Sequence, residues 1–173
     1  MTARRTLRII EDTRQQIVRA PLFPAETKGR WVWNIEVVTG KLDTGDYSLD
    51  GWTGRGNLRP GLCVEWKRSI DELAGNLKDD ERDRFKREIA RMLLFERRII
   101  VVCQPFEWVH APPPGIEIRN QWNPDSLAAN FDAIQECGVA MKFLPNEQQA
   151  AMYVTEVVRR FAERKRDAEE GDE

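Results

Sequence analysis

Short apolar runs alternate with amphipathic segments along this chain of 173 residues. Residues 62–64 and 99–103 are continuous apolar runs, which are typical of strands buried on both faces of a sheet. Segments rich in aromatic and β-branched residues predict further strands at 7–10, 31–38, 47–49 and 139–144. Apolar residues at helical spacing predict helices at 79–95, between Asn123 and Gly138, and at 146–166. This alternation predicts an α/β domain with a central mixed β-sheet and helices on both faces.

An acid and a lysine stand two residues apart at the end of the apolar run 62–64. Because side chains alternate along a strand, Glu65 and Lys67 project to one side of the sheet and Trp66 to the other. Buried charges are costly unless something pairs them, and a divalent metal and a phosphate would do so. Asp46 follows a glycine and precedes the predicted strand 47–49, so it can supply another carboxylate. These residues are a minimal set for metal-dependent phosphodiester cleavage: the carboxylates hold Mg²⁺, and the lysine steadies the attacking water or the developing charge.

The composition is that of a globular protein, with 41% hydrophobic and 32% charged residues. No apolar run approaches the roughly 18 residues of a membrane span, so we expect no membrane association. The formal net charge is −2, but it becomes +3 without the five acids of the segment 167–173. We expect that segment to be a disordered acidic tail after a domain that spans residues 1–166. The acidic balance therefore argues against a nucleic-acid coat protein and not against a nuclease.

The three cysteines indicate free thiols rather than a disulfide framework. Cys63 and Cys103 lie in apolar runs, which is typical of buried thiols in a reducing cytoplasm. A structural zinc site would need clustered ligands, and the cysteines and the lone His110 are scattered along the chain. His110 lies in a proline-rich loop with no partner indicated by its spacing, so we interpret it as a surface residue.

The motifs around these residues resemble the nuclease domain of the XPF/ERCC4 family, most closely its small phage-type members. The resemblance rests on Gly45-Asp46, a spacer and the pattern Glu65-x-Lys67-x-x-x-Asp71. It extends over nearly the whole chain through three further segments: the opening strand and turn 9–16, the helix motif Arg84-Phe85-x-x-Glu88, and the helix start Asn123-Pro124-Asp125-Ser126. The resemblance implies the restriction-endonuclease-like fold of the PD-(D/E)XK superfamily.

It also implies a DNA endonuclease that depends on Mg²⁺ or Mn²⁺, with branched or flapped DNA in replication, recombination or repair as candidate substrates. The implied metal ligands are Asp46, Glu65 and Asp12, and the implied catalytic residues are Asp46, Glu65, Lys67 and Asp71. Basic residues near the motifs are the expected DNA contacts: Arg14, Arg55, Arg68 and Lys86. We expect DNA as the partner, no small-molecule cofactor and a cytoplasmic location in a bacterium or phage-infected cell. A homodimer stays open.

Two departures from the family pattern keep alternatives open. Trp66 stands where the family has an arginine, and Gln15 stands where it has a glutamate. A glutamine can coordinate a metal through its carbonyl oxygen but brings no charge. The second hypothesis is therefore a catalytically degenerate DNA-binding or scaffold subunit with the same fold. A third is a regulatory protein that binds another protein through its last helix.

Overall fold

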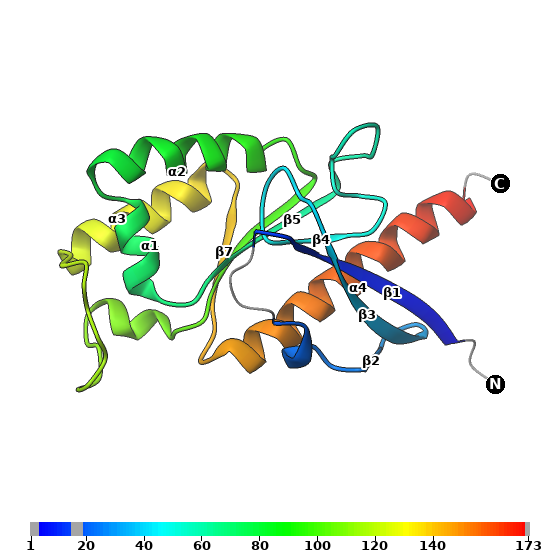
Figure 1. Ribbon diagram of the computed structural model, residues 1–173, viewed down its shortest axis with the longest axis horizontal. Coiled ribbons are helices and arrows are strands. Elements are labelled where there is room, and N and C mark those ends of the chain that lie inside the picture. The colour runs from blue at the N-terminus through cyan, green and yellow to red at the C-terminus, as the bar shows by residue number, and fades with distance from the viewer. Residues whose placement is uncertain (1–3, 15–18, 172–173) are drawn as a thin grey trace.

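The computed structural model describes residues 4–14 and 19–171, apart from the side chains of residues 79 and 80. In that part of the chain, seven strands form one sheet in the order β2-β3-β1-β4-β5-β6-β7 (Figure 1). The strands are β1 (Arg4–Asp12), β2 (Glu26–Lys28), β3 (Val32–Gly40), β4 (Tyr47–Leu49), β5 (Leu62–Lys67), β6 (Arg97–Val102) and β7 (Ala140–Phe143). The helices are α1 (Ile70–Asn76), α2 (Asp79–Met92), α3 (Pro124–Glu136) and α4 (Glu147–Gly171), with short 3₁₀ turns η1 (Ala20–Leu22) and η2 (Phe106–Val109). The predicted α/β architecture with a mixed sheet is confirmed.

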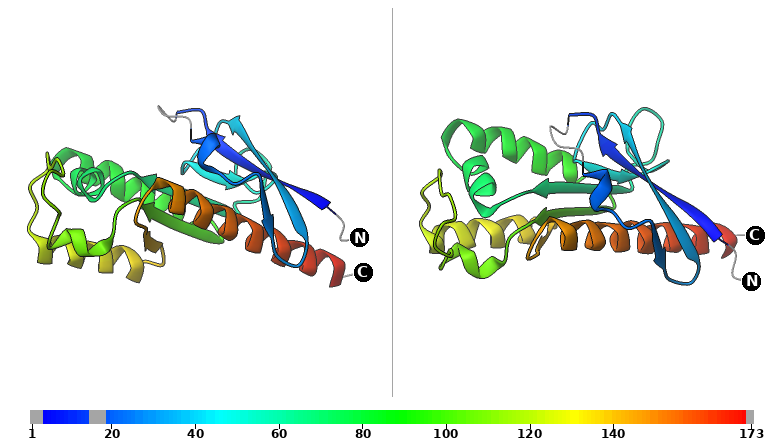
Figure 2. Two further views of the ribbon diagram at one scale, coloured as in Figure 1. Left: turned by 90° about the horizontal axis from the view of Figure 1, so that it is seen from below. Right: turned by 60° about the horizontal axis from the view of Figure 1, so that its bottom comes forward.

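Alternate residues of β5 and β6 enter two different apolar clusters. Val64, Ile99 and Val101 pack with residues of α4. Cys63 and Ile100 pack with residues of α1, α2 and α3. Because neighbouring residues of a strand face opposite sides, α4 covers one face of the sheet and the other three helices cover the second. Figure 2 shows α4 extending along one side of the sheet toward the chain termini. Across the described residues, no helix combines the length and apolarity that a membrane span requires.

The short strand β4 places Asp46 between β1 and β5. β4 is antiparallel to both neighbours, so its first residue lies beside the carboxyl ends of β1 and β5. The Asp46 amide donates to the carbonyl of Val64 (2.8 Å), and the Asp12 amide donates to the carbonyl of Asp46 (2.9 Å). Gly45 precedes it with a φ of 78°, and a Cβ there would lie 2.6 Å from the Cys63 Sγ. The glycine therefore allows the chain to turn against β5 and aim Asp46 at the sheet edge.

Side-chain caps fix the starts of α1 and α3, and the sequence motifs indicated the start of α3 at Asn123. The Ser69 hydroxyl accepts from the Glu72 amide, and the Asn123 side chain accepts from the Ser126 amide. Pro124 occupies the first turn of α3, where its missing amide costs nothing. Because β5 ends at Lys67 and α1 begins at Ile70, the Ser69 cap holds α1 directly beyond the acid–lysine pair.

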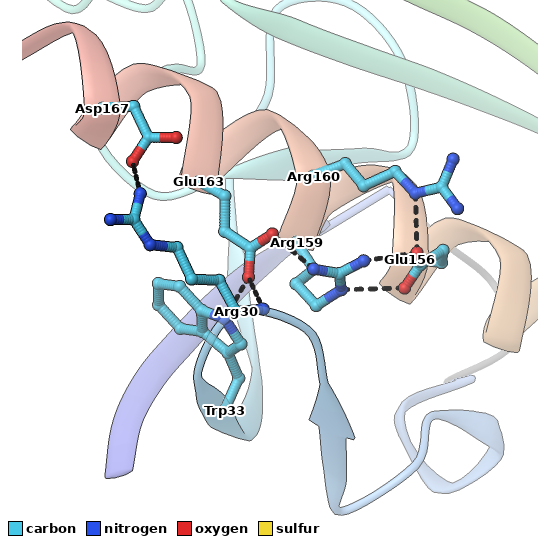
Figure 3. Close-up of polar contacts among 7 residues, drawn as sticks. All are labelled: Arg30, Trp33, Glu156, Arg159, Arg160, Glu163 and Asp167. Carbon is cyan, nitrogen blue, oxygen red and sulfur yellow. Dashed lines mark hydrogen bonds and ion pairs between the residues drawn. The ribbon is translucent and has the colours of Figure 1, made fainter. Parts of the chain in front are cut away.

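The last helix is longer than the sequence suggested, and a polar network ties it to the β2–β3 turn (Figure 3). Arg159 is buried between Glu156 and Glu163 on α4. Glu163 also accepts hydrogen bonds from the Trp33 indole (3.1 Å) and the Arg30 amide (3.2 Å). Arg30 reaches further along α4 to Asp167 (2.6 Å). α4 therefore continues through Gly171, five residues into the segment expected to be a disordered tail, because ion pairs hold that last part in the helix.

Candidate active site

A cleft of about 710 Å³ opens at the edge where β1 and β5 end. Asp46 and Glu65 both line it, as do Asp71, Arg14 and Arg68 from the sequence prediction. The remaining lining residues were not predicted as site residues: Arg19, Trp66, Ser69, Glu72, Arg84, Glu117, Arg119 and Asn120. The fold thus brings together two acids that are 19 positions apart in the sequence, Asp46 from the start of β4 and Glu65 from β5.

Glu65 and Lys67 form a buried ion pair on one side of β5. The Lys67 Nζ lies 2.7 Å from the Glu65 Oε1, and the two side chains are only 8% and 7% exposed. This confirms that both side chains point to the same face. The Lys67 ammonium also lies over the ring of Phe85 on α2, 5.6 Å from its centroid. Burial alone would lower the pKa of Lys67, but the Glu65 carboxylate outweighs this effect and raises it. Lys67 therefore stays cationic across the physiological range.

The two acids of the cleft, Asp46 and Glu65, both have raised pKa values. Burial raises the pKa of Glu65 to about 7 even though Lys67 opposes the shift, and Glu88 on α2 raises it further. Burial, and then the charge of Glu65, raises the pKa of Asp46 well above its ordinary value, although the Trp66 amide donates to the Asp46 Oδ2 (2.7 Å). The Glu65 Oε2 is buried and accepts no hydrogen bond from the residues that the structure describes. A buried carboxylate oxygen without a hydrogen-bond donor, beside a second acid whose pKa is raised, is typical of a site that holds a cation.

Asp12 lies beside this centre, but its side chain is committed to the neighbouring loop. Its Oδ1 accepts from the Leu42 amide (2.9 Å), and its Oδ2 accepts from the Arg14 guanidinium (2.5 Å). It does not line the cleft, although its backbone is bonded to that of Asp46. In this arrangement Asp12 orients Arg14 toward the cleft.

Asp71 lines the cleft and binds the segment of Arg119 and Asn120, which also lines it. Its Oδ1 accepts from the backbone amides of Arg119 (3.0 Å) and Asn120 (2.7 Å). The Asn120 side-chain amide donates to the Asp71 carbonyl oxygen (3.1 Å) and to its Oδ2 (3.3 Å). These contacts fix the segment between η2 and α3 against α1. Asp71 is thus placed to position the cleft wall.

The four basic residues expected to contact DNA divide into two pairs. Arg14 and Arg68 are exposed and line the cleft. Arg55 is exposed on the loop that joins β4 to β5. That loop lies at the opposite end of these antiparallel strands from Asp46 and Lys67 (Figure 1). Lys86 is also outside the cleft lining, on the solvent side of α2 in an exposed ion pair with Asp83 (3.7 Å). The structure therefore gathers Arg14 and Arg68 at the candidate site and leaves Arg55 and Lys86 outside it.

Of the two departures from the family pattern, Trp66 can be placed and Gln15 lies outside the described residues. The Trp66 ring packs against Tyr47, with centroids 5.6 Å apart, and is only 3% exposed. The guanidinium of Arg19 lies over the same ring, 5.4 Å from its centroid. Sequence patterns did not single out Arg19, because it precedes η1 in a segment with no regular periodicity. Glu88 lies one helical turn beyond Phe85, and that spacing is the sequence signal that could have placed it near Lys67.

Similarity to known proteins was found by comparing structures and not by comparing sequences. The sequence matches no protein-family model and no curated protein. XPF from Aeropyrum pernix superposes with a TM-score of 0.61 over 88% of this chain at 19% sequence identity. The chain has the fold of XPF. XPF from Aeropyrum pernix in a complex with DNA matches 94% of the chain with a TM-score of 0.59 at 19% identity. The chain spans about 60% of the length of the first XPF structure and 66% of the second. The fold implied by the sequence motifs is thereby confirmed.

Within this XPF fold, the residues at the cleft fit a hard divalent cation better than a soft one. Asp46 and Glu65 offer carboxylate oxygens, and the Glu65 Oε2 is buried without a hydrogen-bond donor in the described structure. No cluster of three or more acidic, cysteine or histidine side chains placed to hold a metal occurs among the described residues. Mg²⁺ commonly binds through one or two carboxylates and completes its coordination with water and substrate phosphate. The two-carboxylate set therefore fits Mg²⁺ or Mn²⁺ and does not fit zinc.

Proposed function

We propose that this chain is a divalent-metal-dependent DNA nuclease that hydrolyses phosphodiester bonds in the cleft of Asp46 and Glu65. The observation that carries the proposal is the pair of carboxyls at the cleft, Asp46 and Glu65, with a buried Glu65 oxygen that accepts no hydrogen bond from the described residues and raised pKa values for both acids. Exposed arginines line the cleft around them: Arg14, Arg68, Arg84 and Arg119. Exposed Glu72 and Glu117 line it as well, and Arg119 pairs with Glu117 (2.8 Å). Carboxyls that can hold a cation, with arginines around them, suit a metal beneath a phosphate backbone.

Each residue then has a defined role. Asp46 and Glu65 would hold Mg²⁺ or Mn²⁺, which supplies Lewis-acid polarisation of the phosphate and of water. Lys67, which pairs with Glu65 and does not itself line the cleft, would hold Glu65 in place and stabilise the charge that develops on the phosphate. Asp71 positions the cleft wall, and Asp12 orients Arg14. Arg14 and Arg68 contact the DNA backbone, and the DNA complex of the XPF match supports DNA as the partner.

The test is a cleavage assay with matched metals and substrates. The purified protein is incubated with plasmid, single-stranded, Y-shaped and flapped DNA in Mg²⁺, Mn²⁺, Ca²⁺ or EDTA. We expect cleavage in Mg²⁺ or Mn²⁺ and none in Ca²⁺ or EDTA, with the substrate panel showing whether branched DNA is preferred. In parallel, millimolar Mn²⁺ should raise the melting temperature of the wild type and leave that of Asp46→Ala unchanged. Equal shifts in both proteins would place the metal elsewhere.

A second function is favoured by one observation. Trp66 fills the position of the family's arginine with a buried ring, which suits a protein that keeps the fold and binds DNA without cleaving it. Tight DNA binding in Ca²⁺ with no cleavage of any substrate would establish this function. The third hypothesis, partner binding through the last helix, finds no support, because the apolar face of α4 is buried in the chain's own core. Light scattering would decide whether the chain forms a homodimer.

A further inference from the structure

Arg19 is a buried arginine at the cleft that none of the sequence motifs includes. It is only 5% exposed, yet it lines the same cleft as Asp46 and Glu65. Among the arginines that line the cleft in the described ranges, Arg14, Arg68, Arg84 and Arg119 are exposed and Arg19 alone is buried. A cation in such a position has lost most of its hydration and is fixed before any ligand arrives.

The contacts of Arg19 include an aromatic ring, an ion pair and a backbone hydrogen bond. Its guanidinium lies over the Trp66 ring, 5.4 Å from the ring centroid. Its Nε lies 3.9 Å from the Glu147 Oε2 at the start of α4, a distance for an ion pair and too long for a hydrogen bond. Its backbone amide donates to the Glu11 Oε1 (3.1 Å), which also accepts from the Tyr47 hydroxyl (2.9 Å). Glu11 therefore holds the backbone of Arg19, and the Trp66 indole covers the guanidinium at the cleft.

Arg19 lines the same cleft as the candidate metal ligands Asp46 and Glu65. Lys67 is ion-paired with Glu65 at 2.7 Å and does not line the cleft, whereas Arg19 does. A guanidinium held flat can present two N–H groups to two phosphate oxygens, which an ammonium cannot do with the same geometry.

We propose that Arg19 is the phosphate-binding residue of the cleft and that Trp66 is the platform that holds it. The proposal rests on the proposed nuclease function. It implies that a guanidinium reaches the reacting phosphate from the segment before η1, although position 66 carries no arginine. Trp66 is then a part of the site and not a sign of its decay.

The rival explanation is that Arg19 only neutralises two nearby acids, the buried Glu11 and the half-exposed Glu147. Glu147→Gln is the matched control, because it removes the ion-pair partner and leaves the guanidinium on Trp66. A neutralising role predicts that Glu147→Gln and Arg19→Ala disturb the protein in the same way. A phosphate-binding role predicts that Glu147→Gln cleaves DNA like the wild type and that Arg19→Ala does not.

The experiment compares wild type, Arg19→Ala, Arg19→Lys and Glu147→Gln by three measurements. These are kcat and KM for DNA cleavage in Mn²⁺, DNA affinity in Ca²⁺ at several salt concentrations, and melting temperature. For Arg19→Ala we expect kcat to fall on the order of 10²-fold and the salt-dependence slope to fall by about one. Arg19→Lys should keep the slope and lose part of the rate, because a point charge replaces the planar fork.

Chemical rescue tests the role of the guanidinium even if Arg19→Ala is less stable than the wild type. Free guanidinium chloride at about 50 mM should restore part of the kcat of Arg19→Ala, relative to the same concentration of NaCl, and should not accelerate Glu147→Gln. Absence of rescue together with an unchanged salt slope would overturn the proposal. So would a Glu147→Gln variant that loses cleavage as severely as Arg19→Ala.

The outcomes separate the two proposals. If the wild type cleaves nothing in any metal, the nuclease proposal fails, and the salt slope in Ca²⁺ still decides whether Arg19 binds phosphate. If the wild type cleaves DNA and Arg19→Ala cleaves it equally well, the nuclease proposal stands and the assignment of Arg19 fails.

Discussion

Two clusters of buried charge in this molecule are built in opposite ways. On α4, Arg159 is paired with both Glu156 and Glu163, and Glu163 is further bonded to Trp33 and the Arg30 amide (Figure 3). At the cleft, Glu65 has one oxygen on Lys67 and the other without a donor in the described structure. The shifts in pKa follow this difference. Arg159 lowers the pKa of Glu156, whereas burial raises the pKa of Glu65 and of Asp46.

The comparison teaches how to separate structural charges from functional ones. In the α4 cluster each charge has its partner within the protein, so removing one partner leaves another charge without compensation. At the cleft, a buried carboxylate oxygen without a donor in the described structure and two raised pKa values indicate groups that a ligand would stabilise. Mutations in the α4 cluster should therefore change stability and not chemistry, and mutations in the cleft should change chemistry.

The largest expected effect is the loss of cleavage in Asp46→Ala and in Glu65→Ala. Each variant removes a carboxylate that holds the metal, so the rate should fall on the order of 10³-fold or more. Glu65→Ala also leaves Lys67 buried without its ion-pair partner, so its melting temperature in EDTA should fall, whereas Asp46→Ala relieves repulsion with Glu65 and should keep or raise the melting temperature in EDTA. Cleavage rates in Mn²⁺ and thermal unfolding in EDTA measure both effects. A variant that cuts DNA at nearly the wild-type rate would refute the assignment of the site.

Arg159→Met should show the opposite behaviour. Removing one partner of a buried ion pair leaves Glu163 uncompensated, which costs about 3 kcal/mol of unfolding free energy. The methionine keeps most of the packing, so the loss reports on charge. Denaturant unfolding gives the free energy, and the cleavage rate per folded molecule should be unchanged at a temperature well below the transition. A matched control is Arg160→Met, which removes an exposed partner of Glu156 and should cost less than about 1 kcal/mol.

Lys67→Ala should separate binding from chemistry within the cleft. The carboxylates stay in place and one point charge among several cationic groups is lost, so DNA affinity in Ca²⁺ should change little and the salt slope by about one. The cleavage rate should fall on the order of 10²-fold, because the charge acts mainly on the transition state. Affinity at several salt concentrations is compared with the rate in Mg²⁺. Equal losses in affinity and rate would make Lys67 an ordinary phosphate contact.

The smallest expected effect is the change with pH in the free energy of unfolding of the metal-free protein. The pKa of Glu65 is raised in the folded state to about 7, above its value in the unfolded chain. Protonated Glu65 therefore makes its full contribution to stability when the pH is below the pKa of the unfolded chain. That contribution is lost as the pH rises through about 7. We expect the free energy of unfolding in EDTA to fall between about pH 5 and pH 8, with a contribution on the order of 2 kcal/mol from Glu65.

Glu65→Gln isolates that contribution, because the amide does not titrate. The difference in unfolding free energy between Glu65→Gln and wild type should grow in favour of the variant as the pH rises. Urea titrations at about pH 5, 6, 7 and 8 measure it. Parallel pH profiles for the two proteins would show that Glu65 ionises normally in the fold, and the contrast with the α4 cluster would disappear.

The sequence alone determined the features that depend on neighbouring residues. Glu65 and Lys67 share a face because side chains alternate along a strand, and the structure confirms it. The caps Ser69 and Asn123 start α1 and α3 because their side chains bond backbone amides three residues on. The continuous apolar runs of β5 and β6 predicted buried strands for the same local reason. These local signals were enough to predict an α/β domain with a mixed sheet and the pair at the centre of the candidate site, whereas the restriction-endonuclease-like fold was implied by the resemblance of the motifs.

Only the tertiary structure decided what lies around that pair. Arg19 reaches Trp66 from 47 positions away in the sequence, and Asp71 holds Asn120 from 49 positions away. The β4–β5 loop carries Arg55 away from the acids because the two strands are antiparallel, so their connection lies at the other end of the sheet. Glu156, Arg159 and Glu163 have helical spacing, but their contact with Arg30 and Trp33 depends on how α4 crosses the sheet. Packing between distant segments sets these positions, and no pattern of adjacent residues encodes it.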